Sequence, residues 1–168
     1  LTDINEIQED EKGNLWIATN SNGVCIYNPG SGNMQWLKHN VQKSGNQLLS
    51  NSVNAIHIGR NNYVWISTSS AGFNGYNMQT DEYTDYTVAN SGLSNDGINI
   101  VLEDESSNLW IGSKTGLNYI KAGSNTVNRI YTKINGLPDE SINGLETDEY
   151  NNLWISTNMG LASLNTQT

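Results

Sequence analysis

The sequence is poor in cysteine, in basic residues and in long apolar runs, and each shortage narrows what the chain can be. Cys25 is the single cysteine among 168 residues, which excludes an internal disulfide and a cysteine-rich zinc site. Eight Lys and Arg stand against 17 Asp and Glu, and the net charge of −9 argues against nucleic acid as a partner. No run of 18 apolar residues occurs, so we expect no membrane-spanning helix and no membrane contact from this segment.

Residues and motifs for catalysis are also scarce. His39 and His57 are the two histidines, and no Gly-x-Ser-x-Gly, His-Glu-x-x-His or glycine-rich phosphate loop occurs. Carboxylates are plentiful, but an acid–base pair needs a geometry that the sequence does not supply. We therefore expect no catalytic residue, no metal site and no cofactor in this segment.

What the sequence has instead is one unit that recurs four times. A Leu-Trp-Ile core, Val-Trp-Ile in the second copy, carries tryptophans that are 49, 45 and 44 residues apart. An Asn stands eleven residues before each Trp, and a Gly followed by an apolar residue stands six or seven residues after it. The aligned residues are Trp16, Trp65, Trp110 and Trp154, with Asn5, Asn54, Asn99 and Asn143. Agreement at so many positions predicts four copies of one structural unit.

Each copy has the pattern of short strands separated by turn residues. In the first copy these strands are Ile4–Glu9, the Leu-Trp-Ile segment, Val24–Tyr27 and an outer strand around Met34 and Leu37. Four antiparallel strands in about 45 residues are typical of a β-propeller blade. We therefore predict an all-β fold in which residues 1–168 form a single β-propeller portion of four blades. The blades cover approximately 2–49, 50–94, 95–138 and 139–168, and the last blade lacks its outer strand.

The aligned residues have expected structural roles within the blades. The four tryptophans are predicted to lie in the core, because stacked blades cover both faces of a middle strand. The four asparagines are expected to bond backbone between neighbouring blades, although they could instead line the central channel and touch a ligand. Three residues before each Trp, a tight turn with positive φ is expected. That position holds Gly13, Asn62, Ser107 and Asn151.

The incomplete last copy leaves open edges in the predicted ring. Propellers normally close, and an uncovered strand edge invites pairing with another chain. We therefore expect further propeller blades, from a longer parent protein, or a second copy of the chain at the open edges. A ring closed by these four blades alone is the alternative.

Two rims of the predicted propeller differ in character. The acidic rim lies at the turns between the first and second strands and holds Glu9, Asp10, Glu11, Glu103, Asp104, Glu105, Asp148 and Glu149. These acids are interpreted as solvated and turn-forming residues, with a calcium site as the alternative. The polar rim lies at the turns between the second and third strands. Its candidate ligand-binding residues are Asn20, Asn22, Ser69, Ser70, Lys114 and Asn158, whose donors and acceptors suit a polyhydroxylated ligand.

The repeat resembles the two-component regulator propeller family, whose unit runs roughly E-D-x-x-G-N-L-W-I-G-T-x-x-G-L. The first copy carries this pattern from Glu9 to Thr19, and the third from Glu103 to Ser113 followed by Gly116 and Leu117. The fourth keeps Asp148 and the Asn-Leu-Trp-Ile core, whereas the second has Gly59 and Arg60 in place of the acidic pair. The connectors Gly92-Leu93-Ser94 and Gly136-Leu137-Pro138 also look like the link between blades in that family.

The resemblance implies a ligand-sensing segment of a bacterial signal-transduction receptor, periplasmic or extracellular, without chemistry of its own. Many members of the family sense sugars, so an oligosaccharide or other small ligand is the partner that the resemblance implies. Two alternatives stay open. One is the propeller of a carbohydrate-active lyase or hydrolase, for which His57 is the first residue to test. The other is a structural scaffold for protein interactions.

Overall fold

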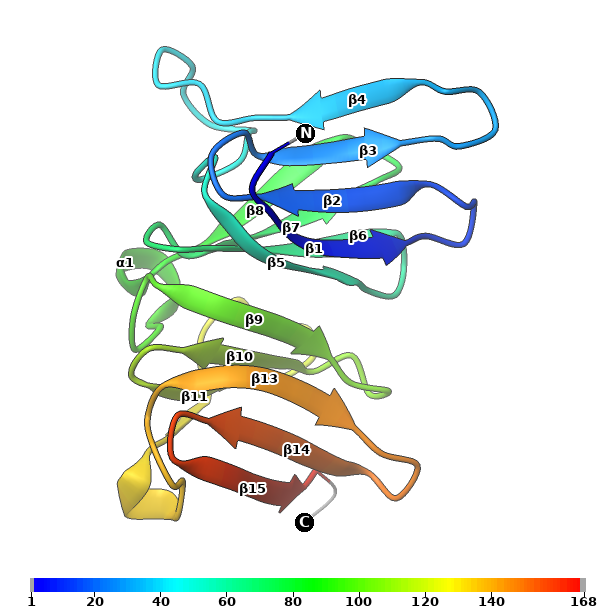
Figure 1. Cartoon of the computed structure of the whole chain (residues 1–168). Helices are drawn as coiled ribbons and strands as arrows, with labels where there is room; N and C mark the ends of the chain where they lie inside the picture. Colours follow the sequence, from blue (N-terminus) through cyan, green and yellow to red (C-terminus); the bar gives the residue numbers. More distant parts are fainter. Residues whose placement is uncertain (1, 167–168) are drawn as a thin grey trace.

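Four antiparallel sheets, one for each copy of the repeat, make up the computed structural model (Figure 1). The structure describes residues 2–166; residue 1 and residues 167–168 of the expected propeller portion lie outside the described residues. The first sheet contains β1 (Ile4–Glu9), β2 (Leu15–Thr19), β3 (Val24–Tyr27) and β4 (Met34–Leu37). The second contains β5 (Val53–Ile58), β6 (Tyr63–Thr68), β7 (Phe73–Asn77) and β8 (Glu82–Tyr86). The third contains β9 (Ile98–Glu103), β10 (Leu109–Ser113), β11 (Gly116–Ile120) and β12 (Arg129–Tyr131).

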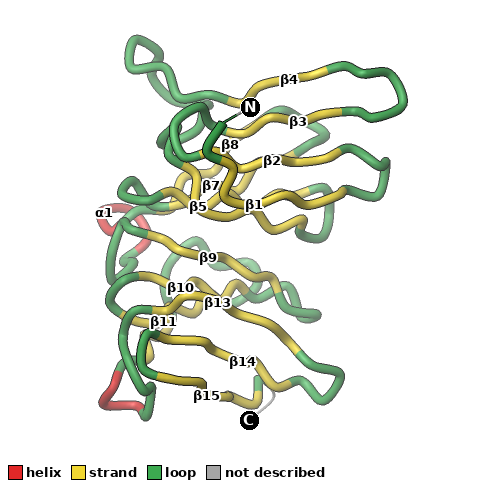
Figure 2. Tube along the Cα trace, in the orientation of Figure 1, coloured by secondary structure: helices red, strands yellow, loops and turns green. Residues whose placement is uncertain are grey.

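The fourth sheet has three strands over the described residues: β13 (Ile142–Thr147), β14 (Asn152–Thr157) and β15 (Gly160–Asn165). In every sheet the strands pair in chain order, so each repeat is an antiparallel meander. Over residues 2–166 the helical segments are two single turns, α1 (Val88–Ser91) and the 3₁₀ turn η1 (Lys133–Asn135), both in linkers between sheets (Figure 2). The all-β prediction is confirmed, including the three-stranded last sheet.

The turn between the first and second strands has the expected backbone in all four sheets. Gly13, Asn62, Ser107 and Asn151 have φ of 77°, 64°, 60° and 62°, in the left-handed region. Asn and Gly adopt this region at low cost, and an Asp just upstream stabilises three of the turns. In the first sheet, Asp10 Oδ1 accepts from the backbone N–H groups of Lys12 and Asn14, each at 2.9 Å.

The sheets are arranged as propeller blades. The first strand of each sheet packs against the first strand of the next, with β1 on β5, β5 on β9 and β9 on β13. The sheets therefore fan outward from these four strands, and the first and last sheets lie at the two ends of the resulting arc (Figure 1). We refer below to the four sheets as blades 1 to 4.

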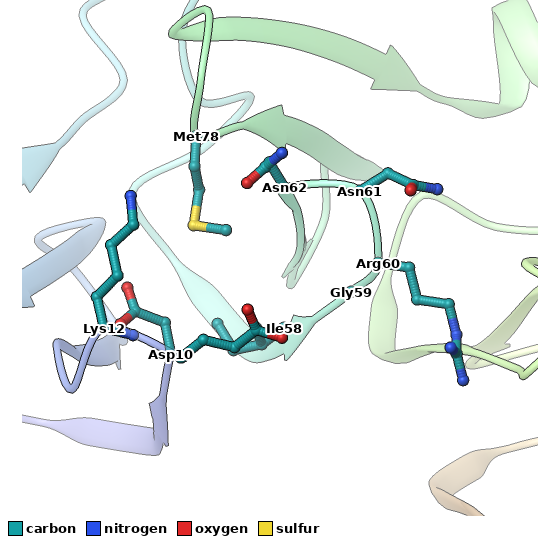
Figure 3. A pocket seen from close by; sticks show the side chains of 9 residues that line it. Asp10, Lys12, Ile58, Gly59, Arg60, Asn61, Asn62 and Met78 are labelled. Carbon is teal, nitrogen blue, oxygen red and sulfur yellow. Dashed lines mark hydrogen bonds between the residues drawn. The ribbon is translucent and has the colours of Figure 1, made fainter.

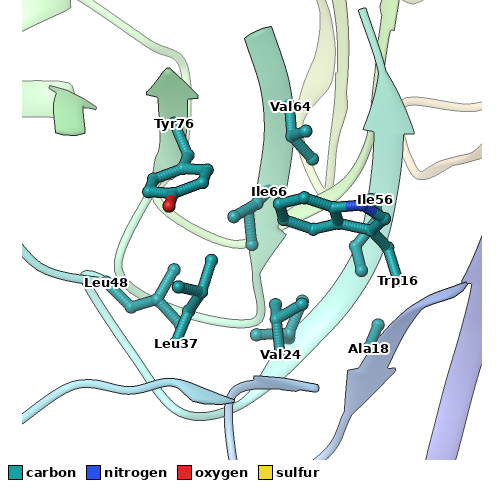
Figure 4. Close-up of a cluster of buried hydrophobic side chains, with 10 residues drawn as sticks. Trp16, Ala18, Val24, Leu37, Leu48, Ile56, Val64, Ile66 and Tyr76 are labelled. Carbon is teal, nitrogen blue, oxygen red and sulfur yellow. The ribbon is translucent and has the colours of Figure 1, made fainter. Parts of the chain in front are cut away.

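Apolar cores lie between successive blades and repeat the same composition. From one blade, each core contains the aligned Trp and the apolar residue after the Gly that recurs in every copy. From the next blade, it contains residues of the first and second strands. Between blades 1 and 2 it contains Trp16, Ala18, Val24, Leu37, Leu48, Val53, Ile56, Val64, Ile66 and Tyr76 (Figure 4). Burial of apolar surface at about 25 cal/mol per Å² makes these junctions the main source of stability.

The small residue two positions after each Trp makes room for the neighbouring blade. At Gly112, an added Cβ would lie 2.7 Å from Ile142 Cγ2 of blade 4 and 2.9 Å from Ile100 Cγ2. Side chains this close would have to move, so even Ala would push blades 3 and 4 apart. The small residue therefore fixes the spacing between blades.

The prediction that all four aligned tryptophans lie in the core is wrong for Trp154. Trp16, Trp65 and Trp110 are 2%, 8% and 3% exposed, whereas Trp154 is 40% exposed. The first three are covered by the blade that follows each of them, and no described residue covers the same face of blade 4. Repetition in the sequence does not guarantee burial, because burial also depends on a neighbour.

Candidate functional site

The six residues of the polar rim lie at one end of the blades, in the turns that join the second strand to the third. Five of the six are exposed: Asn20, Asn22, Ser70, Lys114 and Asn158. Ser69 is half-buried at the end of β6. All four blades contribute to this rim, as the repeat predicts.

A chain of hydrogen bonds connects part of the polar rim across three blades. Ser52 Oγ donates to Asn20 Oδ1 at 3.2 Å, and Ser69 Oγ donates to Ser52 Oγ at 2.7 Å. Lys114 Nζ continues the chain by donating to the backbone oxygen of Ser69 at 3.3 Å. The structure thus brings Asn20, Ser69 and Lys114 together through Ser52, a linker residue that the sequence analysis missed because it lies outside the turns.

The other polar-rim residues stand apart from this chain. Asn22 Nδ2 donates to its neighbour Ser21 Oγ at 3.4 Å, and Asn158 Oδ1 accepts from Asn143 Nδ2 at 2.9 Å. Ser70 lies next to Ser69, exposed at the tip of the β6–β7 turn. Hydrogen bonds therefore connect the polar rim across blades 1 to 3 but do not extend to Asn158 in blade 4.

Three of the aligned asparagines join neighbouring blades. Asn5, Asn54 and Asn99 each donate from Nδ2 to a backbone oxygen of the next blade, Val53, Ile98 and Ile142, at 2.7, 2.8 and 2.7 Å. Asn143 differs because its amide donates instead to Asn158 within its own blade. The hydrogen bonds of Asn5, Asn54 and Asn99 therefore tie neighbouring blades together.

The acidic rim has a role that the sequence analysis missed. Asp10, Asp104 and Asp148 each accept the indole N–H of the tryptophan six residues later, at 3.0, 2.9 and 2.9 Å. Asp10 and Asp104 form their turns, as expected, but they are buried and not solvated. Burial by itself would raise the pKa of Asp10, but hydrogen bonds from Trp16 and Asn14 leave that pKa below its ordinary value. The constant six-residue spacing was the signal that could have found this role.

Blade 2 replaces this aspartate with a carboxylate from blade 3. The register of the sheets aligns Ile58 and Gly59, and not Gly59 and Arg60, with the acidic pair Glu9 and Asp10. Glu103 Oε2 instead accepts the Trp65 indole N–H at 2.9 Å and the backbone N–H of Arg60 at 3.0 Å. A Cβ at Gly59 would collide with that same carboxylate oxygen, so the glycine is what admits it.

A groove of three adjoining hollows runs between blades 1 and 2 on the side of the acidic rim. The first, of about 270 Å³, is lined by charged and amide side chains together with Ile58 and Met78 (Figure 3). It shares Asp10, Lys12 and Met78 with a hollow of about 150 Å³, which in turn shares Gln35, Tyr76 and Asp81 with one of about 330 Å³. None of these three hollows is lined by a residue of the polar rim, so the predicted ligand residues are not at the concave part of this face.

His57 is the first residue to test for catalysis. It lies on β5, half-buried, opposite Trp65. Burial lowers the pKa of His57 below its ordinary value, and the opposing influence of Glu103 and Glu146 is the weaker one. Within residues 2–166, no three His, Cys, Asp or Glu side chains are grouped so as to hold a metal ion.

Comparison with known families decides what kind of repeat this is. Residues 2–21 and 136–159 match the family described as the two component regulator propeller. These segments are two-component regulator propeller repeats. They contain the first-strand, turn and tryptophan pattern of copies one and four, together with the Gly136-Leu137-Pro138 connector. The resemblance drawn from the sequence is confirmed.

Solved structures show the same propeller fold. With a TM-score of 0.87 and 23% identity, the chain is similar to the extracellular domain of BT3049 from B. thetaiotaomicron, assigned as a hybrid two component system; the match covers 97% of this chain and 22% of that one. The chain is also similar to the extracellular domain of BT4673 from the same organism, assigned as a one component system, with a TM-score of 0.79 and 22% identity. That match covers 98% of this chain and 23% of that one. The computationally designed Ika4 protein matches with a TM-score of 0.71 and 9% identity, over 98% of this chain and 92% of that one.

The chain spans about a fifth of the length of the two extracellular domains. No curated protein matches the chain. None of the helices in the part of the chain that the structure describes is long and apolar enough to cross a membrane.

Proposed function

We propose that this chain is a non-catalytic segment of the ligand-sensing propeller of a bacterial signal-transduction receptor, located in the periplasm or outside the cell. Two of its four repeats match the two component regulator propeller family, and its fold is that of extracellular domains assigned to a hybrid two component system and a one component system. We further propose that the ligand is a carbohydrate and that it binds the polar rim.

The observation that carries the carbohydrate proposal is the hydrogen-bonded chain from Asn20 through Ser52 and Ser69 to Lys114. It presents hydroxyl, amide and ammonium groups side by side, which match the alternating donors and acceptors of a sugar. Because these groups come from three blades, a bound oligosaccharide would contact several blades at once. A ligand that favours one arrangement of blades or adjoining domains shifts the receptor toward it.

Lys114 gives the proposed site its selectivity. Its ammonium is exposed and is held by one backbone carbonyl oxygen, so two of its three donors remain for a ligand. A sugar carboxylate or sulfate would form a charge-assisted bond there, stronger than one to a neutral hydroxyl. Uronate-containing or sulfated oligosaccharides should therefore bind better than their neutral counterparts.

The test is binding of the chain to a panel of neutral, uronate-containing and sulfated oligosaccharides, followed by calorimetry on the best ligand. Lys114→Ala should weaken binding of the anionic ligand by about tenfold or more, the loss of one charged hydrogen bond. Lys121→Ala, an exposed lysine on the acidic-rim side, is the matched control and should change nothing. Equal affinity in the two variants, or no binding across the panel, would refute the polar rim as the site.

A further inference from the structure

The groove between blades 1 and 2 gathers positive charge on a chain that is otherwise acidic. Four of the eight basic residues line its three hollows, against three of the 17 acidic residues. The basic residues are Lys12, Lys38, Lys43 and Arg60, and the acidic residues are Asp10, Glu11 and Asp81. Asp10 already accepts the Trp16 indole N–H, and Asp81 already accepts the Tyr76 hydroxyl. The groove is therefore where a chain of net charge −9 repels an anionic partner least.

None of these four basic side chains forms an ion pair with an acid of the described chain. Within residues 2–166 the one salt bridge joins Lys133 to Asp139, neither of which lines the groove. Lys12 lies alongside Met78 at the first hollow (Figure 3), and Lys43 lines the third. Each end of the groove thus carries an ammonium group whose charge a ligand can neutralise.

The floor of the groove is the outer surface of the apolar core between blades 1 and 2. Four side chains that line the hollows are half-buried and pack against that core: Ile26, Ile58, Met78 and Tyr83. Beneath them Tyr76 is 3% exposed, and its ring centre lies 4.9 Å from that of Tyr83. A ligand that covers the open side of these groups gains about 25 cal/mol for each Å² of apolar surface that it buries. The flexible Met78 side chain can adapt to the shape of an apolar group above it.

The linker between β4 and β5 forms one wall of the groove, and hydrogen bonds hold it in place. Asn46 Oδ1 accepts the backbone N–H of Tyr83 on β8 at 3.0 Å, and Lys43 Nζ donates to the backbone oxygen of Asn46 at 3.1 Å. Gln47 Nε2 donates to the backbone oxygens of Asn40 and Lys43. Both blades have all four strands, so the groove is part of the stack itself and does not depend on the uncovered face of blade 4.

We infer that this groove binds an extended acidic peptide segment of another protein, in which apolar side chains alternate with acidic ones. The carboxylates of the peptide meet Lys12 and Lys43, and its apolar side chains cover the floor around Met78. An anionic oligosaccharide matches the cations but not the floor, where Ile26 and Ile58 offer no donor or acceptor to its hydroxyl groups. This inference does not rest on the carbohydrate proposal, because no residue of the polar rim lines the groove.

The first test is a selection of ligands for the intact chain from an array of random ten-residue peptides. Peptides in which acidic residues alternate with large apolar ones should be enriched, and their binding should weaken as the salt concentration rises. A preference for basic or uncharged peptides, or no peptide above background, would overturn the proposal.

The second test measures binding of the best peptide by fluorescence anisotropy at about 0.15 M salt, where charges far from the ligand are screened. Lys12→Glu and Lys43→Glu reverse exposed charges at the two ends of the groove and should each weaken binding by about three- to tenfold. Lys121→Glu, at an exposed lysine outside the groove, is the matched control and should leave the affinity unchanged. Equal losses in all three variants would mean that net charge alone attracts the peptide, and would overturn the groove as its site.

The third test concerns the apolar floor. Met78→Gln keeps the length and charge of the side chain and should weaken binding by about threefold or more, because apolar contact is lost. Met159→Gln, at a methionine that is 73% exposed outside the groove, is the matched control. Circular dichroism shows whether each variant remains folded, and a peptide with serine in place of its apolar residues tests the floor without altering the protein.

Two further outcomes separate this groove from other sites and ligands. If the serine-substituted peptide binds as tightly, or a sulfated oligosaccharide displaces the peptide as effectively as the unlabelled peptide does, the groove recognises charge alone and the peptide proposal is refuted. Lys114→Ala should leave peptide binding unchanged, because Lys114 belongs to the polar rim. A loss of peptide binding in that variant would place the peptide on the polar rim and overturn the groove.

Discussion

Blades 3 and 4 carry the same tryptophan motif in two different environments. In both blades the Trp indole N–H donates to the upstream Asp at 2.9 Å, and that Asp accepts a backbone N–H four residues later at 2.9 Å. Trp110 is 3% exposed and Trp154 is 40% exposed. The local hydrogen bonds therefore form without a covering blade, and burial is added by the neighbour. The comparison therefore separates the hydrogen bonds that one repeat forms alone from the burial that a following blade adds.

The largest expected effect is the difference between truncating these two tryptophans. Trp110→Ala should lower the free energy of unfolding by about 3 to 5 kcal/mol, because it empties a packed junction. Trp154→Ala removes the same indole and the same hydrogen bond from a half-open face, and should cost about 2 kcal/mol less than Trp110→Ala. Denaturant unfolding, monitored by far-ultraviolet circular dichroism, measures both.

Both variants are compared with the unaltered chain as the reference. Equal losses from the two positions would mean that the local hydrogen bond, and not the covering blade, provides the stability. That result would mean that the covered blade 3 and the uncovered blade 4 do not differ in what their tryptophans contribute to stability.

Blade 2 sharpens the comparison, since its Trp65 depends on a carboxylate from blade 3. Glu103→Ala should cost about 1 to 3 kcal/mol, because the N–H groups of Trp65 and Arg60 lose a charged acceptor. Gly59→Asp alone should also destabilise, since its side chain meets the Glu103 carboxylate. In the double variant the new Asp occupies the position that Asp10 has in blade 1. The cost should then fall below the sum of the two single losses by about 1 to 2 kcal/mol.

A matched control for this cycle is Glu105→Ala, which removes an exposed acid from the same turn and should change stability by less than about 0.5 kcal/mol. Additive losses in the double variant would show that Glu103 and position 59 do not share a role. The carboxylate of Glu103 would then not stand in for the aspartate that blade 2 lacks.

The sequence predicts the blade itself well, because the signals for it are local. The strand from Ile4 to Glu9 and the positive φ at Asn62 follow from apolar pattern and turn chemistry within one repeat. The bond from Glu103 to Trp65 joins residues 38 positions apart, and nothing in either repeat read alone indicates it. The exposure of Trp154 likewise depends on which blade follows. The candidate ligand residues on the polar rim were located by turn position, but Ser52, which connects them, carries no repeat signal.

The smallest expected effect concerns acid, and it isolates the part of the motif that needs no neighbour. Hydrogen bonds from Asn152, and then from Trp154, lower the pKa of Asp148 to about 2 from its ordinary value of 3.8. A pKa that is lower in the folded state means that the charged carboxylate stabilises the fold above about pH 4. That contribution is lost as the pH falls from about 4 towards 2. Thermal unfolding of the chain should therefore shift to lower temperature across this interval, and less so once Asp148→Asn is introduced. The Asn keeps an oxygen acceptor but cannot titrate, so an identical acid shift in both proteins would show that the lone motif of blade 4 contributes no charge-dependent stability.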